Sequence, residues 1–353
     1  MDELMRTYLQ EIPKVIHYIV DAAFSRPTQW NGNEKTLVLI GSGSSQHAFL
    51  STRPVIQQWT GCVVDTYYPH AFLDEPELNR RYDPQSTVVI GLSQTGTSSG
   101  TFVALRRAKS AGYRVLTLTG NSDSPIARLG DEHINLQCGE ELTNAKTKGY
   151  SASMVQLMLM GWDLGRVLKR KDPCPLQDLM QALRLAADEI PSIRTQTTAW
   201  VNAHPQWAKA TTLMILGHAE TTALAMEGAL KLSETHYIPV LWADADEYMH
   251  GFHRLLDSQS HLILIEGQGR GRDALSAIKA YARMITPQVL HIGPGDDADI
   301  RIAPWTIIPP LLQEVAVFQT LAVLWPDLAN QEPNAPRHPD LVEHLKSIQL
   351  DVL

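Results

Sequence analysis

A cluster of hydroxyl side chains follows an apolar segment near residue 90 of this 353-residue chain. Thr87–Gly91 is rich in β-branched residues, and the loop after it carries Ser93, Thr95 and Ser98 before a helical pattern begins. Such a loop at a helix N-terminus suits a phosphate, because first-turn amides point outward and the helix dipole favours an anion. A nucleotide-binding loop would add a lysine, which is missing here. We therefore expect a compact phosphate, as on a sugar phosphate; the alternative is an ordinary N-capping turn.

A second loop of similar design lies closer to the N-terminus. It follows another short apolar segment and contains Gly41, Gly43, Ser44 and Ser45. Gln46 stands where a dinucleotide fingerprint requires its third glycine, which disfavours a Rossmann oxidoreductase. Ligands of open α/β sheets bind at the carboxyl ends of the strands. We therefore expect one phosphate to bind between the two loops.

The most polar stretch of the second half runs from Ala225 to His253. Glu227, Lys231 and Glu234 are spaced i, i+4 and i+7, so one helical face carries two carboxylates with a cation between them. A carboxylate there is suited to moving a proton; the alternative is a surface salt-bridge stripe. His250 and His253 form a pair without a third ligand at metal-site spacing, so we predict no metal.

The elements that must position these residues occur twice. TLVLIGSGS, STVVIGLSQTG and YRVLTLTGN in the first half correspond in order and spacing to TTLMILGHAE, SHLILIEGQGR and PQVLHIGPG in the second. Strands that alternate with helices imply parallel sheets, so we predict an α/β fold with two tandem doubly wound parallel sheets. The second copy lacks the hydroxyls, which implies one phosphate site per chain. The expected units are an N-terminal helical segment (1–30), a first domain (31–170), a second domain (171–335) and a C-terminal tail (336–353).

The composition excludes several classes of function. The formal charge of −8 and the absence of long basic runs argue against nucleic-acid binding. No apolar run reaches the roughly 18–20 residues that a membrane span needs, and the N-terminus does not resemble a signal sequence. The three cysteines form no CxxC pair, which is typical of reduced thiols. We expect a cytoplasmic protein that contacts neither membrane nor nucleic acid.

Four motifs together resemble a known family. GSGSSQHA, GLSQTGTSSG, ELTNAKTK and MEGALKLSETHY…DEYMHG are similar to segments of the double sugar-isomerase (SIS) domain family. Its members include the isomerase half of glucosamine-6-phosphate synthase and the deglycases of phosphosugar–amino-acid adducts. The resemblance implies two flavodoxin-like domains and C1/C2 proton transfer on a phosphosugar. A proton transfer of this kind needs a carboxylate and no metal or redox cofactor.

The resemblance also assigns roles to residues. It makes Glu234 the base that moves the proton and His250 the group that opens the sugar ring, often across a dimer, while Glu247 matches the family's glutamate three residues earlier. We therefore expect a homodimer or higher homo-oligomer. The implied phosphate ligands are Ser44, Ser45, Ser93, Gln94, Thr95 and Ser98, and further substrate contacts are expected from Gly43, Lys146 and Lys148.

This sequence differs from that of the synthase at several positions, and these differences limit which reactions we expect. No glutaminase segment precedes the matching region, so we expect no release of ammonia from glutamine. The synthase's C-terminal lysine corresponds to Leu341 here, with Lys346 the nearest substitute. Lys146 replaces a small hydroxyl residue and adds a cation for the phosphate or for a substrate carboxylate. We predict an isomerase or deglycase of an aminosugar phosphate or a sugar-phosphate–amine adduct; the alternative is a non-catalytic sugar-phosphate sensor.

Overall fold

The computed structural model describes residues 3–25, 28–75, 77–170, 173–267, 271–304, 306–335, 337–338 and 340. Leu341 and Lys346, which the sequence comparison singles out near the C-terminus, lie outside these residues. Within the described part of the chain, no helix is both long and apolar enough to cross a membrane.

The first half of the chain forms a parallel sheet of five strands in the order β2-β1-β3-β4-β5. Helices connect successive strands, as the alternation of apolar segments and helical patterns predicts. The elements are α1 (Glu3–Ala22), β1 (Thr36–Ile40), α2 (Ser44–Thr60), β2 (Val63–Tyr67), α3 (Pro69–Leu73), α4 (Leu78–Arg81), β3 (Thr87–Leu92), α5 (Ser99–Ser110), β4 (Arg114–Thr119), α6 (Pro125–Leu129), β5 (Glu132–Asn135) and α7 (Lys148–Leu168).

The second half repeats this topology. Its five parallel strands have the order β7-β6-β8-β9-β10, which corresponds strand by strand to the first sheet. The predicted duplication and fold class are thereby confirmed. The elements are α8 (Leu176–Ala203), η1 (Pro205–Lys209), β6 (Leu213–Gly217), η2 (Ala219–Thr221), α9 (Thr222–His236), β7 (Val240–Asp244), α10 (Ala245–Met249), η3 (Phe252–Leu255), β8 (Leu262–Ile265), α11 (Gly271–Ile285), β9 (Val289–Gly293), β10 (Ile300–Arg301) and α12 (Leu311–Leu328).

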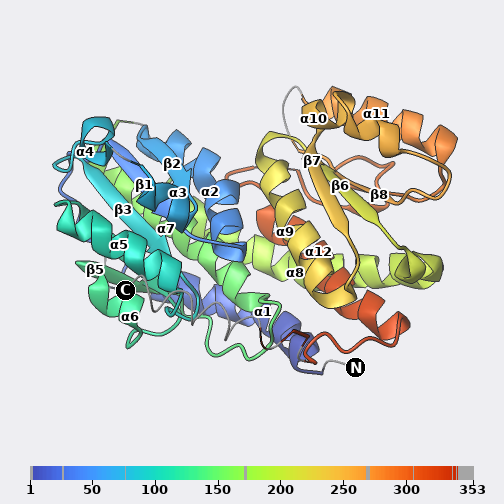
Figure 1. Cartoon of the computed structure of the whole chain (residues 1–353), viewed down its shortest axis with the longest axis horizontal. Coiled ribbons are helices and arrows are strands. Elements are labelled where there is room, and N and C mark those ends of the chain that lie inside the picture. The colour runs from blue at the N-terminus through green and yellow to red at the C-terminus, as the bar shows by residue number, and fades with distance from the viewer. Residues whose placement is uncertain are drawn as a thin grey trace.

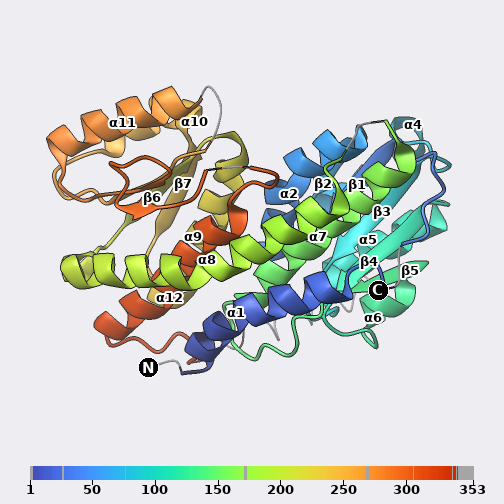
Figure 2. The same ribbon diagram turned by 180° about the vertical axis from the view of Figure 1, so that it is seen from behind.

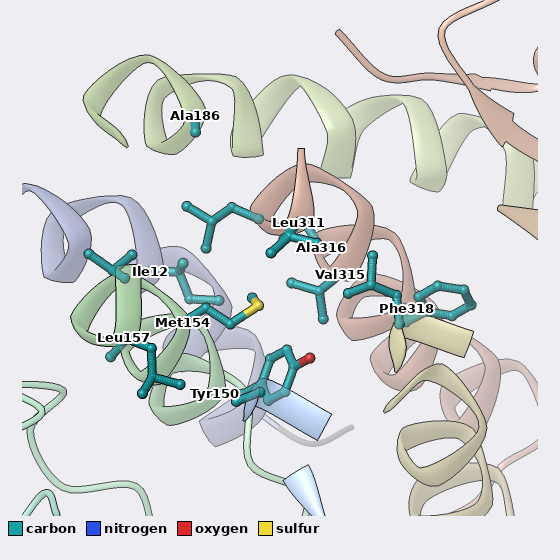
Figure 3. Close-up of a cluster of buried hydrophobic side chains, with 14 of the residues drawn as sticks. Ile12, Tyr150, Met154, Leu157, Ala186, Leu311, Val315, Ala316 and Phe318 are labelled. Atoms are coloured by element: carbon teal, nitrogen blue, oxygen red, sulfur yellow. The ribbon is translucent and has the colours of Figure 1, made fainter. Parts of the chain in front are cut away.

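A layer of long helices lies between the two sheets. The helices α1, α7, α8 and α12 cross this region, as the two opposite views in Figures 1 and 2 show. Their apolar faces meet in one continuous core, part of which is drawn in Figure 3, where Met154 of α7 lies close to Leu311 and Val315 of α12. The same core includes Leu39 of β1 and Ile263 of β8, so the two halves share one interior.

Each sheet also has a smaller core on its outer face. Ile40 of β1 packs with Leu105 of α5 in the first half, and Leu264 of β8 packs with Leu275 of α11 in the second. The shared inner core and the two outer cores bury both faces of both sheets, as purely parallel sheets require. This packing places the carboxyl end of the first sheet beside a helix of the second half.

Candidate functional site

The two hydroxyl-rich loops follow β1 and β3, which are neighbours in the first sheet. The connection through α2 leads to β2 on one side of this pair, whereas the connection through α5 leads to β4 on the other. The direction of winding therefore reverses between β1 and β3. Such a switch point is where ligands bind in doubly wound sheets. The phosphate position predicted from the sequence lies at this point.

Both helices that begin there have starts suited to an anion. Gly43, the N-cap of α2, has a φ of +54°, in the left-handed region that glycine adopts most readily. Gly43 has no side chain with which to cap α2, and Ser98, the N-cap of α5, makes no side-chain capping hydrogen bond. Neither first turn contains an acidic residue. Neither helix therefore supplies an acidic side chain from its own first turn to neutralise the positive end of its dipole.

The hydroxyls of the loop after β3 are arranged around its tight turn. Ser93 is buried, and its carbonyl oxygen accepts a hydrogen bond from the Gly96 amide. Thr95 is exposed, and its Oγ1 lies 2.8 Å from Oγ1 of Thr97. The partly buried Ser98 has its Oγ 3.0 Å from Oγ1 of Thr101, in the first turn of α5. The loop therefore presents hydroxyls of different depth along one helix start.

Glu141 connects this loop to α7. Its Oε1 accepts hydrogen bonds from the Thr147 amide (2.6 Å), the Thr147 hydroxyl (2.7 Å) and the Lys148 amide (3.2 Å), and its Oε2 accepts one from the Gly149 amide (3.1 Å). Oε2 also accepts a hydrogen bond from Gln94 Nε2 at 2.8 Å. A carboxylate of the protein thus neutralises the N-terminus of α7 and holds the Gln94 side chain. The sequence analysis gave Glu141 no role, although an acid shortly before a helix start is a signal for capping.

The three charged residues predicted to share one face of α9 do lie together, but most of this face is buried. Lys231 Nζ lies 2.5 Å from Glu234 Oε2 and 3.7 Å from Glu227 Oε1. The side chains of Glu227 and Lys231 are each 1% exposed, whereas that of Glu234 is 32% exposed. The surface-stripe interpretation is therefore wrong for two of the three residues. The arrangement is a buried ion pair that reaches a partly open carboxylate.

The buried end of this face contacts the start of α2, directly after the glycine-rich loop. Ser44 Oγ donates to Glu227 Oε1 at 2.9 Å, and His47 Nδ1 lies 2.8 Å from Glu227 Oε2. α2 comes from the first half and α9 from the second, so these hydrogen bonds join the two halves. His47 is a residue that the sequence analysis missed; its position one turn into the helix after the glycine-rich loop was the available signal. Ser44 and Glu234 consequently belong to one cluster.

The electrostatics of this cluster favour a proton acceptor. Burial raises the pKa of Glu234, with a further contribution from the Glu227 charge, although the nearby Lys231 acts in the opposite direction. Burial alone would lower the pKa of Lys231, but Glu227 and Glu234 raise it above its ordinary value. A glutamate with a raised pKa is a better base near neutral pH than an ordinary surface carboxylate.

The two predicted lysines have different surroundings. Lys146 Nζ donates to the backbone carbonyls of Glu141 and Thr143, each at 2.7 Å. Burial lowers its pKa, and the charges of Lys231 and Glu234 act on it. Lys146 therefore adds a cation to the same cluster.

Lys148 lies instead at the junction of α7 and α1. Its ammonium is 2.6 Å from Glu11 Oε2 and 4.2 Å from the centre of the Tyr8 ring, and its side chain is buried. Lys148 is therefore paired with groups of the protein itself, rather than placed near the cluster around Glu234.

Glu247 and His250 lie elsewhere on the second half. Both are exposed, Glu247 in α10 and His250 directly after it. Among the described residues, neither side chain makes a hydrogen bond or an ion pair, with Glu234 or with any other residue. Figure 1 shows α10 beside α11, whereas α9 lies between the two sheets. Within one chain, these two residues are separate from the cluster around α9.

The equivalent edge of the second sheet is occupied by charged side chains. Glu266, directly after β8, forms an ion pair with Arg272 and lies 2.8 Å from His291 Nε2. Such a carboxylate disfavours a phosphate, which agrees with the loss of hydroxyls from this copy.

Of the described residues, His218, Asp244 and Asp246 form the one group with metal-ligand spacing, their ligand atoms lying within 4.8 Å of one another. Asp244 Oδ2 accepts hydrogen bonds from the Thr222 hydroxyl (2.7 Å) and the Ala219 amide (3.2 Å). Asp244 Oδ1 accepts one from the Asp246 amide at 3.0 Å. The cluster is thus explained as a cap of the local helix starts.

Curated proteins similar to this chain include aminotransferases. The glutamine–fructose-6-phosphate aminotransferase (isomerizing) of Gloeobacter violaceus is 26% identical over 295 residues, which is 82% of this chain and 48% of that protein. The same enzyme of Streptomyces coelicolor is 26% identical over 314 residues, 86% of this chain and 50% of that protein. The chain therefore spans about half the length of the curated relatives it matches.

Solved structures share the fold over nearly the whole chain. A proposed phosphosugar isomerase from Clostridium difficile 630 has a TM-score of 0.88 and 24% identity, with 97% of this chain and 98% of that chain covered. The C-terminal domain of glucosamine-fructose-6-phosphate aminotransferase from Francisella tularensis has a TM-score of 0.84 and 15% identity, with 95% and 98% covered.

The model of the SIS domain matches residues 32–161 and 207–293, which together are more than half of the chain. The first matched range contains all five strands of the first sheet, β1–β5, and the second contains β6–β9. The chain therefore belongs to the SIS domain family and carries this domain twice.

Proposed function

We propose that this chain transfers a proton between C1 and C2 of a phosphosugar or of its adduct with an amine. The observation that carries the proposal is the setting of Glu234. Its carboxylate is partly open and contacts the buried Lys231 at 2.5 Å, and its helix is hydrogen-bonded to Ser44, a predicted phosphate ligand. A base and a phosphate anchor on one cluster are what this reaction needs.

The proposed reaction begins with binding of the phosphate at the switch point of the first sheet. The helix starts and hydroxyls at Ser44, Ser45 and the loop from Ser93 to Ser98 hold it and orient the open-chain sugar. Glu234 then takes a proton from one of the two carbons, which gives an enediol or an enolamine. Return of the same proton to the neighbouring carbon completes the isomerisation. Hydrolysis of the resulting imine would release the amine from an adduct.

The position of Lys146 supports a substrate with an additional anionic group. The synthase has a small hydroxyl residue here, whereas this chain places a half-buried ammonium within the electrostatic reach of Glu234. An anion on the amine part of an adduct, such as the carboxylate of an amino acid, would pair with it. This favours deglycation of an amino-acid adduct over isomerisation of a simple aminosugar phosphate.

The position of His250 supports a shared site in a homodimer. Trp242, Met249 and Phe252, which are near it in the sequence, are 44%, 45% and 38% exposed, so large apolar side chains lie on this part of the surface. Association of two copies through this region would cover them and carry His250 to the partner's cluster. There the imidazole would exchange the proton that opens the sugar ring.

The proposal is tested by incubating the protein with phosphorylated aminosugars and with amino-acid adducts of sugar 6-phosphates in D₂O. We expect a released amine or an isomerised sugar, with deuterium incorporated at C1 or C2 to the extent that the transferred proton exchanges with solvent. Tight binding of these compounds without any turnover would contradict the proposal and would favour the sensor alternative. Turnover that required an added redox cofactor would contradict it as well.

A further inference from the structure

We propose that binding of the phosphate to Ser44 releases Glu234 from Lys231, with Glu227 as the link between them. Binding of the phosphate would then make Glu234 a stronger base. This inference rests on the proposed function, because it takes Ser44 as a phosphate ligand and Glu234 as the base. It makes Glu227 a positioning residue that acts through Lys231.

The hydroxyl proton of Ser44 is one for which Glu227 and a bound phosphate would compete. A serine hydroxyl has a single proton to donate, and Ser44 gives it to Glu227 Oε1 at 2.9 Å. The other oxygen of this carboxylate is already taken by His47 Nδ1 at 2.8 Å. A phosphate oxygen at the start of α2 would compete with Glu227 for the Ser44 proton. Glu227 Oε1 would then be a buried anionic oxygen without its donor.

Lys231 is placed to replace that donor. Its Nζ lies 3.7 Å from the same Glu227 Oε1, just beyond hydrogen-bond distance, and 2.5 Å from Glu234 Oε2. A buried carboxylate that loses a donor is costly, by about 1–3 kcal/mol. A small movement of the ammonium towards Glu227 restores the missing hydrogen bond. The same movement lengthens the contact with Glu234.

Loss of this contact strengthens the base. The charged groups around Glu234 are Lys231 and Glu227 on α9, His47 on α2 and Lys146 before α7. Lys231 is the cation whose hydrogen bond opposes protonation of Glu234, so its withdrawal raises the pKa of Glu234 further. A sugar without phosphate would meet a paired carboxylate, which is a weaker base. The link thus selects phosphorylated substrates at the chemical step as well as in binding.

The test measures the pKa of Glu234 by ¹³C NMR of carboxyl-labelled protein, with and without saturating inorganic phosphate. The Glu234→Gln spectrum assigns the signal. In the wild type we expect phosphate to raise this pKa by about one unit, the lower end of the effect of a close charge. In Ser44→Ala the pKa is expected to be high already, and added phosphate is expected to raise it by less than in the wild type, through its own negative charge alone.

Ser45→Ala is the matched control, because it removes a neighbouring hydroxyl of the same loop that has no hydrogen bond to Glu227 among the described residues. It should weaken phosphate binding but keep the pKa increase once phosphate is saturating. A phosphate-induced increase in Ser44→Ala equal to that of the wild type, or no increase in the wild type, would overturn the inference. Neither result depends on turnover, whereas an active Glu234→Gln variant would count against the proposed function itself.

Discussion

At the scale of single residues, Lys146 has an unusual environment for a cation. It is half-buried, it donates to two backbone carbonyls, and among the described residues no carboxylate side chain forms an ion pair with it. An ammonium has three donors, so one of them is left for a ligand. Burial also lowers the pKa of Lys146, which means that the charged form gains from an added anion.

We therefore expect Lys146→Met to change the preference for substrates. For adducts whose amine carries a carboxylate, kcat/KM should fall by about 10- to 100-fold, the scale of one charge-assisted hydrogen bond. For matched adducts with an uncharged amine, it should fall by less than about threefold. Lys35→Met, on an exposed lysine, is the control. An equal loss for both classes of adduct, together with weaker binding of inorganic phosphate, would assign Lys146 to the phosphate instead.

At the scale of elements, Glu141 shows how one side chain fixes a loop and a helix start together. Its carboxylate accepts hydrogen bonds from three backbone amides before and within the first turn of α7, and from Gln94 in the loop after β3. It is buried, so its loss leaves several donors without an acceptor.

Glu141→Gln replaces one of the two accepting oxygens by a donor. We expect the free energy of unfolding to fall by about 2 kcal/mol, as hydrogen bonds to a charged group are lost, measured by urea denaturation. Glu140→Gln, on the exposed neighbouring glutamate, should change it by less than about 0.5 kcal/mol. Equal stabilities of the two variants would show that the cap contributes little.

The elements themselves could be predicted from the sequence, because apolar segments and turn residues recur in the same order in both halves. The partners within the site could not be predicted in the same way. Ser44 donates to Glu227 and Gln94 donates to Glu141, and each of these pairs is far apart in the chain. The spacing i, i+4, i+7 identified one face of α9, but only the packing of α9 against α2 and α12 decides that the face is buried.

At the scale of the whole molecule, the shared core determines where the site lies. Because α7, α8, α1 and α12 hold the two sheets against one layer, α9 of the second half meets the start of α2 in the first. His250 stays on the outer surface of the second half. Under the proposed function, a single chain therefore assembles the anchor and the base but not the ring-opening group.

A mixture of two inactive variants tests the shared site. Glu234→Gln supplies His250 but no base, and His250→Ala supplies the base but no imidazole. If His250 serves the partner's cluster, mixed dimers contain one site with both groups, and about a quarter of wild-type activity should return after random subunit exchange, because half of the dimers are mixed and each has one complete site of two. No recovery, with exchange confirmed by mass-labelled subunits, would mean that each site is built from one chain.

The most direct measurement is the turnover of Glu234→Gln on any substrate that the wild type converts. The amide keeps the size and hydrogen-bonding capacity of the side chain but cannot accept the proton. The account predicts that kcat falls by a factor of about 10² or more, the usual scale for a lost general base, while inorganic phosphate still binds. Glu140→Gln should keep wild-type turnover. A Glu234→Gln rate close to wild type would reduce Glu234 to a partner of Lys231 and would contradict the proposed reaction.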